Sequence, residues 1–309
     1  MSITDNISRQ KSILQIMMRI LIIFVFLVSL FPVNKPEVIA QEPDKPQIVY
    51  LPLVFKNSLT SCPEGPEEWL CLLNFYRTTA GVNPVIQNST FTLTIALHTN
   101  YMLLNSTQEN MHTEYEGKPG YTDAGKTAAS QSNMIKLIGG TYLNQKQSID
   151  LWMATPNHRY NMLHPDLDQS GFGLSCDSKN CFSGLNILGS LPPSYQIQMV
   201  NLVFPADKQQ GIPVNRYPIT WGFYMPWTGD ETDYDEVKFV SGKIVDQDNK
   251  SISFSVSEPN RSDGVWTYNN QVVLTPNSDL VPGKIYYIEM TVSYQGRNYS
   301  KSWSFNTAP

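Results

Sequence analysis

The chain has 309 residues and a formal net charge of −5, from 22 basic and 27 acidic side chains. This acidic balance argues against nucleic acid and against anionic lipid headgroups as bulk electrostatic partners. Only four cysteines and four histidines are present.

The first 40 residues are typical of an export signal. Basic residues precede an uncharged run at 20–30, and the small residue Ala40 stands directly before a polar stretch. We therefore expect a secretory signal peptide at residues 1–40, cleaved near Ala40, and a secreted, extracellular protein. The alternative is an uncleaved membrane anchor at residues 13–33, which is long enough to span a bilayer. Cleavage would remove four basic and two acidic side chains and leave a net charge of −7.

The four cysteines form two local pairs in the sequence, Cys62 with Cys71 and Cys176 with Cys181. An even number of cysteines in an exported chain favours disulfides. Three connectivities are possible, and the local one is favoured because a turn sequence separates Cys176 from Cys181. Each bridge would stabilise the fold by about 2–3 kcal/mol. A cysteine metal site is disfavoured, since no C-x-x-C pair exists.

The segment after the signal, residues 41–60, is rich in proline and is expected to be a linker. Hydrophobic residues at helical spacing then predict a helix at about 66–79 and a second one at about 89–104. Strands are expected at three later apolar segments, which are residues 171–174, 184–188 and 198–202.

Residues 148–165 combine a short helix with a histidine near the start of the next helix. Pro156 cannot continue the first helix, which should end near Thr155. Asn157 is then expected to be the N-cap of a helix that holds His158 in its first turn. The positive end of the helix dipole disfavours imidazolium there, so we expect a neutral His158 that can accept a proton or bind a metal. The simpler alternative is a hydrogen bond from His158 to a neighbouring loop.

This segment, with Trp152-Met153 followed by Thr155-Pro156-x-His158-Arg159, resembles the signature of the CAP superfamily in its bacterial branch. The pattern L-N-x-Y-R-x-x-x-G at residues 73–81 resembles the opening helix of the same domain. The resemblance implies an α-β-α sandwich, which we place at residues 61–204.

The composition changes after residue 205, where histidine and cysteine no longer occur. Apolar side chains alternate from Tyr286 to Tyr294 and again from Tyr299 to Phe305, which predicts a β-hairpin. Residues 280–286 resemble the L-x-P-G-x-x-Y segment of bacterial immunoglobulin-like domains, with Tyr286 placed like a tyrosine-corner residue. We therefore expect an α+β chain in which an all-β immunoglobulin-like sandwich at 205–309 acts as a spacer without a ligand of its own.

The resemblance also implies a cleft in which His112 and His158 face each other beside an acidic residue from a G-E-N motif. Here the matching stretch is Gln131-Ser132-Asn133, so Ser132 stands where the family has glutamate. Glu114 is a possible substitute, but its spacing from His112 does not place it in the cleft. Two imidazoles hold zinc only weakly, because closed and catalytic sites need at least three protein ligands.

A nucleophilic role for Ser130 or Ser132 with one of these histidines is an alternative, although no G-x-S-x-G elbow is present. His98 and His164 are expected to be structural, His98 as a hydrogen-bonding residue and His164 as a partner of a helix C-terminus.

Together these features favour an exported, non-catalytic module that binds an apolar or cell-envelope ligand, since lipid binding recurs in the superfamily. The expected ligand-binding residues are His112, His158, Ser132 and Asn133. No cofactor is required, and a divalent metal such as zinc would bind weakly to His112 and His158. The alternatives are a hydrolase that uses the same two histidines and an adhesive or structural surface protein.

Overall fold

The computed structural model describes most of the chain after residue 61. The described ranges are 62–105, 110–138, 142–191, 199–224, 237–259, 261–262 and 269–309. The expected signal peptide or anchor and the linker lie outside them. The chain divides into two units, Met1–Tyr50 and Leu51–Pro309, and every described residue belongs to the second. Within the described ranges, no helix is both long and apolar enough to cross a membrane.

Residues 62–191, which we call the helical half, combine helices with a four-stranded sheet. Its described helices are α2 (Glu68–Thr79), α3 (Ser89–Leu104), α4 (Asp123–Ser130), α5 (Gln145–Met153) and α6 (Pro156–Met162). The sheet has the order β1-β3-β4-β2, with β1 (Ile86–Gln87), β3 (Gln169–Cys176), β4 (Asn180–Asn186) and β2 (Ser132–Ile138). Its pairings are antiparallel except for the parallel pair of β1 and β3.

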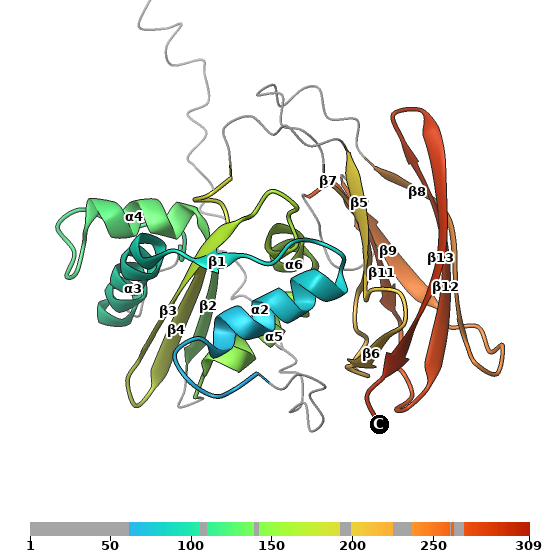
Figure 1. The fold of residues 1–309 in the computed structure, drawn as a ribbon, viewed down its shortest axis with the longest axis horizontal. Helices are drawn as coiled ribbons and strands as arrows, with labels where there is room; N and C mark the ends of the chain where they lie inside the picture. The colour runs from blue at the N-terminus through green and yellow to red at the C-terminus, as the bar shows by residue number, and fades with distance from the viewer. Residues whose placement is uncertain are drawn as a thin grey trace, which may run out of the picture. The chain divides into compact units, whose positions relative to one another are not determined.

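Helices lie on both faces of this sheet (Figure 1). On one face, α3 lies directly over glycines of β3, where a Cβ on Gly173 would come within 2.8 Å of the Ala96 nitrogen. On the other face, Phe172 points away from the glycines, because neighbouring side chains of a strand alternate. Its ring lies 5.9 Å from that of Trp69 in α2 and 6.3 Å from that of Trp152 in α5.

The two long helices confirm the predictions from hydrophobic spacing, while the start of α6 corrects one. The Asn88 side chain caps α3 by accepting hydrogen bonds from the nitrogens of Thr90 and Phe91. The N-cap of α6 is Thr155 rather than Asn157, since Pro156 occupies the first helical position. Proline is tolerated there because that N–H has no partner within the helix.

Residues 199–309, which we call the β half, form two sheets. The first has the order β10-β9-β11-β7-β5, with β10 (Arg261–Ser262), β9 (Phe254–Glu258), β11 (Gln271–Pro276), β7 (Ile219–Tyr224) and β5 (Val200–Phe204). The second has the order β6-β13-β12-β8, with β6 (Gln209–Ile212), β13 (Arg297–Thr307), β12 (Ile285–Tyr294) and β8 (Lys238–Asp246). Aromatic side chains pack between the sheets, where the ring of Phe223 lies 5.4 Å from that of Tyr294 and 5.6 Å from that of Tyr299.

The predicted hairpin is confirmed by the pairing of β12 with β13. Gln295 and Gly296 make its two-residue turn, and both have positive φ angles, of 48° and 67°. The expected strand at 198–202 fell within the sandwich that we placed at residues 61–204, and the structure corrects this. Val200–Phe204 pairs antiparallel with β7, so the strands of the β half begin at Val200. Sequence alternation identifies a strand but not its partner.

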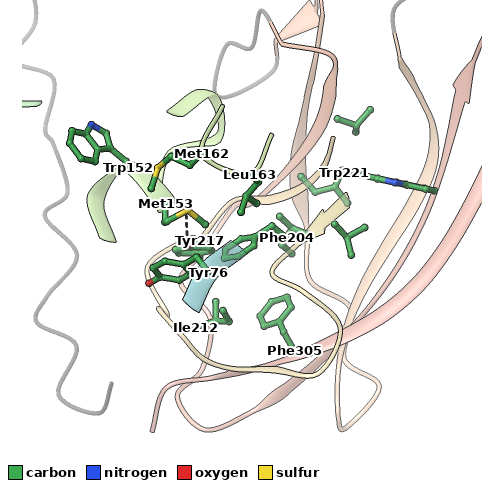
Figure 2. Packing of buried hydrophobic residues seen from close by; sticks show 14 of the residues in the cluster. Tyr76, Trp152, Met153, Met162, Leu163, Phe204, Ile212, Tyr217, Trp221 and Phe305 are labelled. Carbon is green, nitrogen blue, oxygen red and sulfur yellow. Dashed lines mark hydrogen bonds between the residues drawn. The ribbon is translucent and has the colours of Figure 1, made fainter. Parts of the chain in front are cut away.

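The two halves share one hydrophobic core. Buried side chains of α2, α5 and α6 belong to the same cluster as residues of both sheets of the β half. Figure 2 shows Met153 and Tyr76 of the helical half beside Tyr217 and Phe204 of the β half. The Tyr217 hydroxyl donates a hydrogen bond to the Met153 carbonyl at 2.9 Å.

Both predicted disulfides are confirmed. Cys62 is bonded to Cys71 with a Cα–Cα distance of 5.7 Å, which ties the segment before α2 to that helix. Cys176 is bonded to Cys181 with a Cα–Cα distance of 4.1 Å and joins the ends of β3 and β4.

Candidate functional site

His112 lies in the segment between α3 and α4, and its side chain is exposed. Its backbone nitrogen donates to Asn110 Oδ1 at 2.8 Å, and its ring Nδ1 lies 3.2 Å from the Ala129 carbonyl at the end of α4. A carbonyl can only accept, so we infer that Nδ1 carries the proton. In the neutral ring, Nε2 is then the free acceptor.

His158 lies in α6 and is partly buried. Its Nδ1 is 2.7 Å from Thr155 Oγ1, which also lies 3.0 Å from the Trp152 carbonyl. Because the Trp152 carbonyl can only accept, we infer that the Thr155 hydroxyl donates to it; Nδ1 of His158 then donates to Thr155, and Nε2 is again the acceptor.

Burial, with a smaller effect of nearby His112, lowers the pKa of His158 to about 4. His158 is therefore neutral at pH 7. The sequence predicted a neutral ring because of the helix terminus, whereas burial is the main cause in the structure.

The remaining residues of the expected cleft have different partners. Asn133 is 3 % exposed, and its Nδ2 donates to the His158 carbonyl at 3.1 Å, which links β2 to α6. Ser132 is also buried, and its hydroxyl donates to the Ala128 carbonyl at 2.7 Å. The Ser130 hydroxyl donates to the Thr127 carbonyl at 2.9 Å. Both serine hydroxyls thus bond to the backbone of α4, and neither has a hydrogen bond to a histidine in the described structure.

Glu114, the possible substitute acid, is paired with His98 instead. Both side chains are buried, with 3.0 Å between His98 Nδ1 and Glu114 Oε1. The other ring nitrogen of His98 lies 2.9 Å from the Met111 carbonyl, and Glu114 Oε2 accepts from the Thr122 nitrogen at 2.9 Å. The Met111 carbonyl requires a proton on Nε2, so the Nδ1–Oε1 contact holds one further shared proton. The sequence contains no local signal for this pair, whose members are 16 residues apart.

His164 follows α6, but it is not the cationic partner of a helix dipole that the sequence predicted. Its Nδ1 accepts a hydrogen bond from the Asp166 nitrogen at 3.2 Å, and its ring packs edge-on against Tyr224 at 5.4 Å. Burial, with a smaller effect of Arg77, lowers its pKa to about 4. His164 is therefore a neutral, structural residue.

The described residues include no group of three or more His, Cys, Asp or Glu side chains that could hold a metal ion. Two imidazole nitrogens alone do not fit a closed or catalytic zinc site. A surface hollow of about 390 Å³ lies at the start of α2, lined by residues from Pro63 to Asn74, which include neither His112 nor His158.

Residues 70–189 match the CAP family, described as the Cysteine-rich secretory protein family. This region runs from α2 to just beyond β4 and contains both candidate histidines, so the chain carries a CAP domain. A comparison with curated proteins found no match.

Among solved structures, CopC from Methylosinus trichosporium OB3b is 14 % identical, with 38 % of this chain and 94 % of that chain covered and a TM-score of 0.23. An outer surface protein from Borrelia burgdorferi is 15 % identical, with 37 % of this chain and 85 % of that chain covered and a TM-score of 0.28. At these TM-scores neither similarity supports an inference about fold or function.

Proposed function

We propose that this chain is an exported, non-enzymatic protein whose CAP domain binds an apolar or cell-envelope ligand beside His112 and His158. In this proposal the CAP domain is an α-β-α sandwich of the bacterial branch and the β half is an immunoglobulin-like domain. The hydrogen bond that Val281 nitrogen donates to the Tyr286 hydroxyl, at 2.8 Å, supports a tyrosine corner in that domain.

A non-catalytic function is supported by one observation. The candidate hydroxyl, Ser132, and the candidate acid, Glu114, both bond to groups other than His112 and His158. Ser132 donates to the Ala128 carbonyl, and Glu114 is paired with His98. General acid–base chemistry or metal-assisted hydrolysis needs a positioned acid or a third ligand beside the histidines. What the two imidazoles do offer is a pair of Nε2 acceptors, which suit hydroxyl or amide donors of a ligand.

The apolar character of the ligand rests on exposed hydrophobic side chains. Leu104 at the end of α3 is 55 % exposed, and Tyr115, three residues after His112, is 49 % exposed. Export is supported by the two disulfides, because such bonds persist in oxidising compartments.

The experiment is to export the full chain from its expression host and to identify co-purifying molecules by mass spectrometry. The His112→Ala/His158→Ala double variant should lose these molecules. A matched control is Tyr287→Ala, which removes an exposed aromatic side chain of β12 and should retain them. Equal recovery from wild type and double variant would contradict the proposed cleft and favour an adhesive role. Turnover of a co-purified ester or amide that depends on His158 would favour the hydrolase.

A further inference from the structure

The helix that carries His158 is held by the β half on the residues that flank this histidine. Asn157, Arg159 and Tyr160 each contact residues more than 40 positions later in the chain. Within the described residues these contacts come from β5, from β7 and the segment before it, and from residues at and just before the start of β11.

Asn157 is bound through both its backbone and its side chain. The Nδ2 group of Asn269 lies 3.2 Å from the Asn157 carbonyl and 3.4 Å from Asn157 Oδ1. The Nε2 group of Gln271 lies 3.3 Å from the same Oδ1. The residue directly before His158 is thus fixed by two amide side chains of the β half.

Arg159 is buried, with 1 % of its surface exposed. One guanidinium nitrogen donates to the Met153 carbonyl at 3.0 Å and another to the Pro218 carbonyl at 2.9 Å. The guanidinium also lies over the rings of Phe204, at 4.8 Å, and Tyr217, at 5.5 Å. Burial lowers the pKa of Arg159, but a guanidinium remains protonated in proteins, so this charge depends on the carbonyls and rings around it.

Tyr160 completes the contact. Its hydroxyl donates to the Phe223 carbonyl at 2.6 Å, and its ring stacks on that of Tyr224 at 4.4 Å. The Tyr224 hydroxyl in turn donates to the Tyr160 carbonyl at 3.1 Å. Gly222 permits this approach, because a Cβ there would lie 3.3 Å from the Tyr160 ring.

We infer that the β half is the positioning element of the candidate cleft, with Asn269, Gln271 and Tyr224 fixing α6 and thereby the place of His158. The β half is then not a spacer, and the cleft is incomplete without it. The functional meaning of this inference rests on the cleft proposed above, whereas the positioning itself can be measured without a ligand.

The test uses the full chain and the double variant Asn269→Ala/Gln271→Leu. This variant removes the bonds to Asn157, and leucine in β11 has about the size of the glutamine that it replaces. Amide hydrogen exchange in α6 should become about tenfold faster or more, because the helix opens more often once these hydrogen bonds are lost. The NMR signal of the His158 Cε1–Hε1 pair should shift, and that of buried His98 should not.

The matched control is Asn201→Ala, which removes the acceptor of the hydrogen bond that Trp221 Nε1 donates inside the β half. It should leave α6 exchange and the His158 signal unchanged. Tyr160→Phe keeps the ring and removes the hydroxyl bond to Phe223, so it should reproduce the effect even if the double variant does not fold.

Unchanged α6 exchange in the double variant and in Tyr160→Phe would overturn the inference. Equal acceleration throughout the chain would do the same, because it would show a loss of global stability instead. A local change in α6 would support the positioning role, even if the recovery of co-purified molecules proved independent of the histidines. That combination would refute the proposed function alone.

Discussion

Replacement of His98 by alanine would leave a buried carboxyl group without its main partner. The His98 ring bonds to Glu114 at 3.0 Å and to the Met111 carbonyl at 2.9 Å, and Glu114 would keep only its bond from the Thr122 nitrogen. Removing one member of a buried ion pair costs about 3–5 kcal/mol. Since domains have total stabilities of about 5–15 kcal/mol, His98→Ala should fold but unfold at a clearly lower urea concentration.

Glu114→Gln should lower the free energy of unfolding much less, because the Nδ1–Oε1 contact needs only one hydrogen and an amide can supply it. The new amide can donate to Nδ1 of a neutral His98, whose Nε2 still donates to the Met111 carbonyl. The glutamine oxygen can still accept from the Thr122 nitrogen, so every hydrogen bond is kept. We expect a loss of about 1 kcal/mol or less, which is the additional strength of a charged hydrogen bond.

The assay is urea unfolding of both variants at pH 7, followed by tryptophan fluorescence. A loss of stability for Glu114→Gln as large as that for His98→Ala would refute this reasoning. It would show that the pair depends on its charges and not only on its hydrogen bonds. A loss below about 1 kcal/mol for His98→Ala would show that the pair contributes little to the fold, contrary to the usual cost of breaking a buried pair.

Three further outcomes are expected. The pKa values of His158 and His164 in the folded chain are about 4, below the ordinary value of 6.5. Between pH 4 and pH 6.5 the unfolded chain therefore binds more protons than the folded one, so the free energy of unfolding should fall as the pH is lowered through this range. Urea midpoints across this range measure the slope, His164→Gln should reduce it, and a flat profile would contradict the buried, neutral state of both rings. Replacement of Cys176 and Cys181 by alanine should lower stability by about 2 kcal/mol, because the unfolded chain loses a constraint. Free thiols at these positions in the exported protein, found by peptide mapping, would contradict the disulfide and with it this prediction. Calorimetry of the full chain with Zn²⁺ should detect only weak binding, and tight binding that disappears in His112→Ala would show a third ligand that we have not identified.

Local patterns in the sequence were sufficient for several elements of the fold. The spacing of Trp69, Leu72, Leu73 and Tyr76 predicted α2, and all four side chains are buried. Strict alternation predicted β12 and β13, and the short spacing of the cysteines predicted both disulfides. Helix α4 was missed because its buried residues, Gly125, Ala128 and Ala129, are small and form no large apolar stripe.

The partners of individual residues could not be obtained in this way. The resemblance pointed to His112 and His158, but the pairing of Glu114 with His98 and the contact of Arg159 with the Pro218 carbonyl join residues 16 and 59 positions apart. The same is true of β5, which pairs with β7 rather than with a strand of the four-stranded sheet of the helical half. Helix periodicity, strand alternation and short disulfide loops depend on neighbours within a few residues, so the sequence alone determines them. The partner of a strand or of a buried polar group depends on which surfaces meet when the whole chain packs, and this only the tertiary structure decides.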